Sequence, residues 1–287
     1  MKPNATGSIA ELCGWYVRDN PEVRGTHRGI LRRLQDDSIG AVQAADLTAK
    51  DCIDHARFRQ AAGVCAATIS HDFTYLRGVL DYAKPGWNLP KVSSAAIKEA
   101  MPSLRRLRLV GGAARRDQRP TDEQTRCILE WLRASGCDPL IAEVVAFQDQ
   151  SARRVGESCK LLWADLDEQK KTILVRDLKH PRMKEGFNKR AALPDGAFEI
   201  IMRQPRTEER IFPVESKTVS AAYSRACQAL GYTGLTLHSS RRGCATRLLE
   251  QGVSVPMVML VTLHNGPTML LTRYNALKAE DFHARRT

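Results

Sequence analysis

Apolar residues recur every three to four positions over most of residues 8–100, which is the period of an amphipathic α-helix. Ser8 is a plausible N-cap with Glu11 at the capping-box position, and Gly63 and Pro85 follow two further helical segments. The clearest periodicity before Pro85 is at Phe73, Leu76, Val79, Leu80 and Ala83. We therefore predict four helices in this region, forming a small bundle.

From residue 121 onward the pattern is mixed. Thr121 is a candidate N-cap with Gln124 in the box position, and an apolar helix is expected over 138–152. The alternating stretch at 170–179 predicts a strand, and residues 188–195 could be its hairpin partner. The remaining segments read as helices: one begins at Ser254 and ends at Asn265–Gly266, and the last begins at Pro267 and carries Tyr274. The predicted fold class is α+β, mostly helical, with a small antiparallel sheet.

Residues 102–120 contain six arginines, one aspartate and a Gly-Gly pair, which is typical of a basic, partly flexible linker. The predicted organisation is a helical domain at 1–104, a basic linker at 105–120 and a second domain at 121–287. The linker could lie along phosphates or be a solvated loop. Its candidate DNA contacts are Arg105, Arg106, Arg115 and Arg116.

Charge adds a candidate partner. Lys and Arg number 44 against 32 Asp and Glu, a formal net charge of +12 at pH 7. Such an excess suits a polyanion, and nucleic acid is the commonest one. The eight cysteines form no CxxC pair, and the chain has neither an apolar leader nor a long apolar run. We expect a cytoplasmic, nucleoid-associated protein with no membrane segment.

Several familiar sites are missing from the sequence. It has no GxxxxGK[ST] loop, no GxGxxG, no HExxH and no Cys/His cluster at zinc spacing. We therefore expect no cofactor and no metal, and any catalysis must use Arg, His, Lys and a hydroxyl group.

Those residue types do occur in the C-terminal half. His238 and Arg241 are three residues apart and would share one face of a helix, and His264 would stand at a helix end. Tyr274 follows ten residues after His264. Far upstream, Arg154 precedes Glu157 by three residues. Taken alone, each of these residue patterns more often belongs to a solvated surface or to core packing than to a catalytic site.

The ordered combination resembles the catalytic domain of the tyrosine recombinases, the phage-integrase family. The matching pieces are RVGESCKLLWADLD at 154–167, VRDLKHPRMKEGFNKRAALP at 175–194, LTLHSSRRGCATRLLEQGVSV at 235–255 and LHNGPTMLLTRY at 263–274. The N-terminal helices resemble the family's core-binding domain in size, helicity and position only.

The resemblance implies a role for each matching residue. Arg154 and Arg241 would grip the scissile phosphate, because guanidinium donates to two oxygens and stays charged. Tyr274 would be the nucleophile, and His238 and His264 would donate to the phosphate or manage the tyrosine proton.

Two further residues complete the implied site. Lys179 would protonate the leaving 5′ oxygen, with Lys184 as its rival, and Glu157 would orient His or Arg side chains. The implied partners are double-stranded DNA and three further copies of the chain, forming a tetramer on paired sites. The implied reaction is site-specific DNA recombination or integration through a 3′-phosphotyrosyl intermediate, as in mobile elements.

The chain also departs from the family pattern. Arg242 stands where histidine is usual, and Thr262 and Leu263 replace a usual Leu-Gly. The step from His264 to Tyr274 is one residue longer than the common spacing. Arg153 beside Arg154 makes the first arginine ambiguous, and spacing to Glu157 favours Arg154. Two alternatives stay open: a non-catalytic DNA-binding protein on an integrase-like scaffold, and strand relaxation of the type IB topoisomerase kind.

Overall fold

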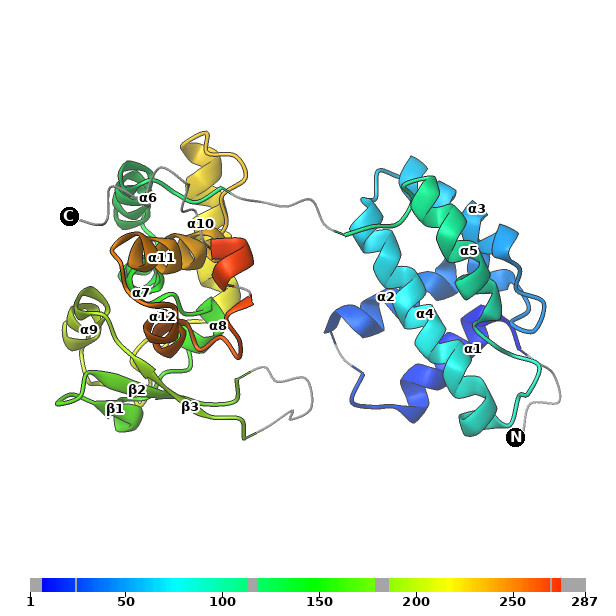
Figure 1. The fold of residues 1–287 in the computed structure, drawn as a ribbon, viewed down its shortest axis with the longest axis horizontal. Coiled ribbons are helices and arrows are strands. Elements are labelled where there is room, and N and C mark those ends of the chain that lie inside the picture. Colours follow the sequence, from blue (N-terminus) through cyan, green and yellow to red (C-terminus); the bar gives the residue numbers. More distant parts are fainter. Residues whose placement is uncertain (1–6, 24, 113–117, 179–185, 269, 275–287) are drawn as a thin grey trace. The chain divides into compact units, whose positions relative to one another are not determined.

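The computed structural model describes residues 7–23, 25–112, 118–178, 186–268 and 270–274, with only the backbone of residues 273 and 274. The chain divides into two compact units, Met1–Arg115 and Arg116–Thr287. The first consists of helices and the second combines helices with a sheet (Figure 1). The expected α+β class, mostly helical, is confirmed. Within the described ranges, no helix is long and apolar enough to cross a membrane.

The first unit holds five described α-helices rather than the four predicted. Their bounds are α1 Ile9–Asp19, α2 Gly25–Asp36, α3 Ala49–Ala61, α4 Ala66–Trp87 and α5 Ala95–Arg106. The Ser8–Glu11 capping box opens α1 as predicted. The predicted end of α4 at Pro85 was wrong: the helix continues to Trp87, and its C-cap Asn88 takes a left-handed conformation. The core of this unit lies between the apolar faces of these helices.

Helix α5 is the one that sequence patterning missed. It runs through Arg105 and Arg106, and Leu104 is fully buried on its inner face. Leu109 and Val110 also pack into the core of the first unit. The basic stretch predicted as a linker from residue 105 therefore begins as an ordered part of the helical unit, because apolar residues alternate with its arginines.

In the second unit, helix α7 (Pro139–Ser151) is central. It packs against α6 (Asp122–Ala134), α9 (Asp195–Met202), α10 (Ser216–Ala229) and α11 (Leu237–Glu250). Its sequence is apolar on nearly every side, which is typical of a helix surrounded by others. The predicted Thr121–Gln124 capping box opens α6.

A three-stranded antiparallel sheet has the order β1 (Leu166–Asp167), β2 (Thr172–Val175) and β3 (Lys189–Ala192). Ile173 and Val175 are buried on one face of β2, and Ile173 pairs with Ala191 of β3. The predicted hairpin is confirmed, and β1 is an additional short strand.

Four short helical segments complete the described part of the second unit: α8 (Val155–Ser158), the 3-10 turn η2 (Trp163–Asp165), α12 (Val255–Thr262) and a π-helical turn, η3 (Leu270–Tyr274). The end of α12 was predicted wrongly at Asn265–Gly266. The helix ends at Thr262, because Leu263 adopts a left-handed conformation (φ 54°). In Figure 1, α8 and α12 lie beside α7 and α11.

Candidate active site

Two adjacent arginines follow α7 and have opposite environments. Ala152 caps α7 in a left-handed conformation (φ 52°), and Arg154 is the N-cap of α8. The side chain of Arg153 is 1% exposed, whereas that of Arg154 is 48% exposed. The Glu157 carboxylate accepts from the backbone N–H of Arg154 at 3.2 Å and also from its guanidinium. The left-handed turn at Ala152 thus leaves the Arg154 side chain exposed and the Arg153 side chain buried.

Arg241 reaches the same place from α11. Its side chain is 1% exposed, and Nη1 donates to the Ala152 carbonyl oxygen at 2.6 Å. Nη2 donates to the carbonyl oxygen of Thr262 at 2.9 Å, so this one guanidinium joins the end of α7 to the end of α12. Arg241 therefore stands at a fixed point where three helices meet.

A pocket of about 190 Å³ opens between α8 and α11. Three of the predicted residues line it: Arg154, exposed His238 and buried Arg241. The remaining lining residues are Gln148, Arg153, Val155 and Leu237. The pocket is thus lined by the cationic side chains of three arginines. The Glu157 carboxylate contacts these arginines but is not among the lining residues.

His264 stands behind Arg241. Its Nε2 lies 3.4 Å from Nη2 of Arg241, and its Nδ1 lies 2.7 Å from Oγ1 of Thr262. Because guanidinium can only donate, this geometry favours the tautomer that carries its proton on Nδ1 and donates to Thr262. Burial, together with the charges of Arg241, Arg154 and Arg153, lowers the pKa of His264 to about 4. His264 is therefore neutral at physiological pH in this structure.

Glu157 is shared by three arginines. Besides its contacts with Arg154, its Oε2 lies 3.8 Å from Nη1 of Arg153 and 3.9 Å from Nη1 of Arg241. Burial alone would raise the pKa of this carboxyl group, but the surrounding guanidinium groups outweigh burial and lower it. Glu157 thus remains ionised and compensates the crowded positive charge.

The other predicted residues either lie outside this pocket or are described only in part or not at all. Tyr274 ends the π-helical turn, and only its backbone is described. Lys179 and its rival Lys184 lie outside the described residues, as do Arg115 and Arg116. Arg105 and Arg106 are exposed in the last turn of α5, in the other unit.

The strand hairpin is nevertheless tied to the His264 segment. Nζ of Lys189, the first residue of β3, donates to Oδ1 of Asn265 at 2.7 Å. Asn265 directly follows His264. Strand β3 is therefore joined to the segment that carries His264.

A family comparison decides the identity of this arrangement. The model of the phage integrase family matches residues 113–281, which is more than half of the chain. The chain belongs to the phage integrase family. It is a tyrosine site-specific recombinase, and the resemblance read from its motifs is confirmed; neither alternative activity is favoured.

Solved structures of phage integrase family members share the fold. The transposon Tn1549 integrase in complex with transposon right end DNA has a TM-score of 0.72 at 16% identity, covering 96% of this chain and 98% of that one. A lambda integrase tetramer bound to a Holliday junction has a TM-score of 0.70 at 17% identity, covering 91% and 78% respectively. A lambda integrase dimer on a core site gives a TM-score of 0.70, also at 17% identity, covering 95% and 97%. No curated protein sequence matches the chain significantly.

The sequence motifs of the integrase family did not reveal two neighbours of the site. Thr262 fixes both Arg241 and His264, and Gln148 donates from Nε2 to the Arg153 carbonyl oxygen at 3.0 Å. Thr262 ends an apolar run and Gln148 stands among other polar residues, and both patterns are too common to identify a site residue.

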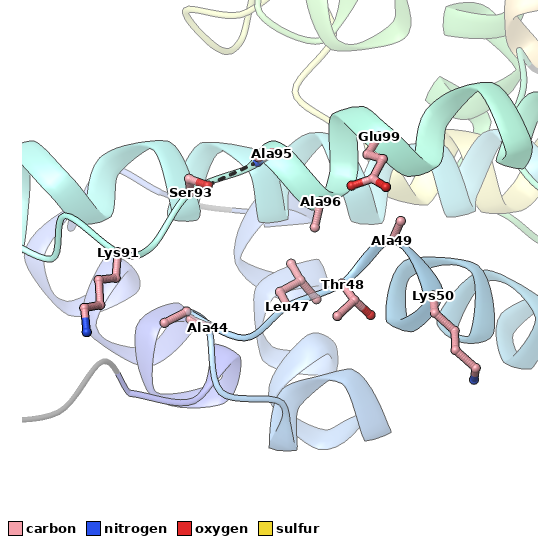
Figure 2. Close-up of a pocket in the computed structure, with 11 residues that line it drawn as sticks. Ala44, Leu47, Thr48, Ala49, Lys50, Lys91, Ser93, Ala95, Ala96 and Glu99 are labelled. Atoms are coloured by element: carbon pink, nitrogen blue, oxygen red, sulfur yellow. Dashed lines mark hydrogen bonds between the residues drawn. The ribbon is translucent and has the colours of Figure 1, made fainter.

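A larger pocket of about 480 Å³ lies in the first unit, between the loop before α3 and the start of α5 (Figure 2). It is lined mainly by small residues, with Lys50, Lys91 and Glu99 as its charged groups. Figure 2 shows the two lysine side chains pointing away from one another at the rim. It gathers no combination of groups that suits phosphoryl transfer. Across the described part of the chain, no group of three His, Cys, Asp or Glu side chains could hold a metal ion.

Proposed function

We propose that the pocket between α8 and α11 binds the scissile phosphate of double-stranded DNA and that Tyr274 attacks it. The observation that carries this proposal is the convergence of Arg154, His238 and Arg241 on one pocket, with His264 behind Arg241. A phosphodiester carries one negative charge, and forked guanidinium donors match its two non-bridging oxygens. The roles implied by the family thus coincide with a site of suitable charge and size.

The reaction would proceed by exchange of one phosphoester for another. The phenolic oxygen of Tyr274 releases its proton to solvent and bonds to phosphorus, the bond to the 5′ oxygen breaks, and Lys179 gives that oxygen a proton. A free phenol has a pKa of about 10, so the arginines must stabilise the developing charge. The 3′-phosphotyrosyl link retains the energy of the broken phosphodiester bond. A 5′-hydroxyl from a second duplex can then attack this link and reverse the step.

We assign different tasks to the two histidines. His238 is exposed at the pocket and is placed to donate to a phosphate oxygen. His264 is half-buried between Arg241 and Thr262, and as a neutral acceptor it orients the Arg241 guanidinium. The Glu157 carboxylate holds Arg154 by accepting hydrogen bonds from its backbone N–H and from its guanidinium.

The remaining proposals concern the assembly. The helical first unit is proposed to be a core-DNA-binding domain and residues 121–287 the catalytic domain, and Arg105, Arg106, Arg115 and Arg116 are proposed to contact DNA phosphates. The lambda integrase that shares this fold is a tetramer on a Holliday junction. We propose that this chain likewise assembles as a tetramer on paired DNA sites, in the integration or excision of a mobile element.

The decisive experiment is a trapped adduct. Duplexes enriched from a random library by binding to the full chain would be rebuilt with a nick beside the cleavage position, so that the cut end diffuses away. We expect the wild-type chain to accumulate a covalent DNA–protein adduct and Tyr274→Phe to form none. Absence of adduct with wild type, or an adduct undiminished in Tyr274→Phe, would overturn the proposal. Relaxation of plasmid lacking any enriched site would instead indicate topoisomerase activity.

A further inference from the structure

Arg153 is a buried cation that the proposed mechanism does not use. Its side chain is 1% exposed, although the next residue, Arg154, points into solvent. Burial lowers the pKa of the Arg153 guanidinium to about 9, so it stays protonated at neutral pH. Moving a charged group out of water is costly, and an apolar side chain would fill the same space without that cost. The contacts that Arg153 makes must therefore account for its presence.

Those contacts lead to the end of α12. The Nη2 group of Arg153 donates to the carbonyl oxygen of Val261, and Nη2 of Arg241 donates to the next carbonyl oxygen, that of Thr262. The last carbonyls of a helix lack intrahelical partners and carry its negative dipole end. Two buried guanidinium groups thus cap the C-terminus of α12 side by side.

The capped turn is the one that sets the position of His264. Thr262 holds His264 through Oγ1, and left-handed Leu263 then directs the chain toward the histidine. A shift of the last turn of α12 would move Thr262 and His264 together relative to Arg241. Arg153 is placed to resist that shift, because its own backbone is held by Gln148 and by Ser151 Oγ at 3.3 Å.

Resting on the proposed function, we propose that Arg153 is a positioning residue that holds the end of α12 so that Arg241 and His264 keep their places at the phosphate pocket. Its Nε and Nη1 groups have no hydrogen-bond partner in the described part of the chain, and Nη1 faces Glu157 at 3.8 Å. The buried charge therefore acts on the site through α12 and Glu157, while Arg154 and Arg241 bind the phosphate.

The rival interpretation is that Arg153 binds DNA itself. In that case its removal would weaken affinity, as loss of any phosphate contact does. A positioning residue instead leaves affinity intact and slows the chemical step, because small errors of placement among catalytic groups cost about 100-fold in rate. Affinity and single-turnover rate thus separate the two roles.

The test compares Arg153→Met, Arg153→Lys and wild type, with Arg247→Met as the matched control. Arg247 also joins two helices through a backbone carbonyl, from α11 to Asp149 of α7, but it lies outside the pocket. Each variant is assayed for cleavage at saturating nicked duplex, for DNA affinity, and for thermal unfolding. The imidazole of His264 is titrated by NMR without DNA, its signal being assigned by its loss in His264→Gln.

We expect Arg153→Met to slow cleavage by at least about tenfold, with affinity unchanged within a factor of about two. The pKa of His264 should rise toward the ordinary value of about 6.5, and Arg153→Lys should recover part of both effects. Arg247→Met should alter unfolding only. An unchanged cleavage rate, or a loss explained by affinity, would overturn the assignment.

The titration also separates this inference from the proposed function. If the wild-type chain forms no adduct, the proposed recombination mechanism is contradicted. The DNA-free titration then decides by itself whether Arg153 affects the pKa of His264. An unchanged His264 titration in Arg153→Met would show that Arg153 does not position the histidine.

Discussion

Nη2 of Arg241 and Nε2 of His264 lie 3.4 Å apart, although 23 residues separate them in the chain. The same Nη2 also donates to the Thr262 carbonyl oxygen, so the two side chains share one backbone anchor. A guanidinium this well held loses little conformational entropy when a phosphate binds, which is the physical basis of preorganisation.

Replacing Arg241 by lysine should therefore harm both fold and reaction. One ammonium group cannot reach the carbonyl oxygens of Ala152 and Thr262 together, so at least one buried carbonyl loses its donor. Leaving such a group unpaired costs about 1–3 kcal/mol. Urea unfolding should show this loss, and adduct formation should fall by at least about 100-fold. Arg203→Lys, at the exposed C-cap of α9 and outside the pocket, is the control; equal effects in both variants would contradict this prediction.

The low pKa of His264 predicts a pH-dependent stability. In the unfolded chain the imidazole titrates near about 6.5, whereas in the folded chain its pKa is about 4, because burial and the facing Arg241, Arg154 and Arg153 outweigh Glu157. Between these values the unfolded state binds more protons, so folding stability is lost as pH falls from 6.5 toward 4.

The test compares wild type with His264→Gln across that range. The wild-type free energy of unfolding should fall relative to the variant by on the order of 2 kcal/mol. His71→Gln, at an exposed position in the first unit, serves as the control and should track wild type. A difference between wild type and His264→Gln that is constant with pH would show that His264 titrates normally.

The approach to Tyr274 allows a different prediction. The step from His264 is one residue longer than the common family spacing, and the described backbone forms a π-helical turn over Leu270–Tyr274. A π-turn holds one more residue than an α-turn between similar end points. Deleting Thr272, which is exposed, should convert it to an α-turn and leave adduct formation within about tenfold of wild type.

The opposite change supplies the control. Inserting an alanine after Thr272 adds a residue that the turn has no room to absorb, and we expect adduct formation to be lost. If the deletion abolishes the adduct while thermal unfolding is unchanged, the π-turn does not compensate for the longer spacing.

Local signals explain which elements were predictable. The Ser8–Glu11 and Thr121–Gln124 boxes and the buried pair Ile173 and Val175 rest on residues within one or two turns, and the structure confirms each. Helix α5 was missed because its exposed arginines resemble a linker until the burial of its apolar face is known.

The site itself was only partly predictable, for a related reason. Spacing to Glu157 selected Arg154 over Arg153, and the structure likewise exposes Arg154 at the pocket. The contact of Arg153, however, is with Val261, 108 residues away. No periodicity reports a contact at that separation. The early end of α12 was missed similarly, because Leu263 takes a left-handed conformation that its residue type does not predict.

The exposed arginines at the end of α5 lead to the last prediction. Neither Arg105 nor Arg106 has a side-chain hydrogen bond or ion pair within the described residues, so both are available for phosphates. Each phosphate contact contributes about 0.9 to the slope of log affinity against log salt. Changing both arginines to glutamine should lower the magnitude of that slope by about 2. The slope is measured in binding assays between 50 and 200 mM salt, because complexes with many phosphate contacts lose roughly 10³–10⁵ in affinity over that range.

The matched control removes the same charge elsewhere. Arg203 and Arg206 are paired with Glu143 and Glu168 in the second unit, and changing both to glutamine should leave the salt slope unchanged. Adding Arg115→Gln and Arg116→Gln to the first pair should lower the slope further, if the basic stretch follows the backbone as proposed. An unaltered slope in the Arg105/Arg106 variant would show that the end of α5 does not contact DNA, because counterion release depends only on the phosphates that are neutralised.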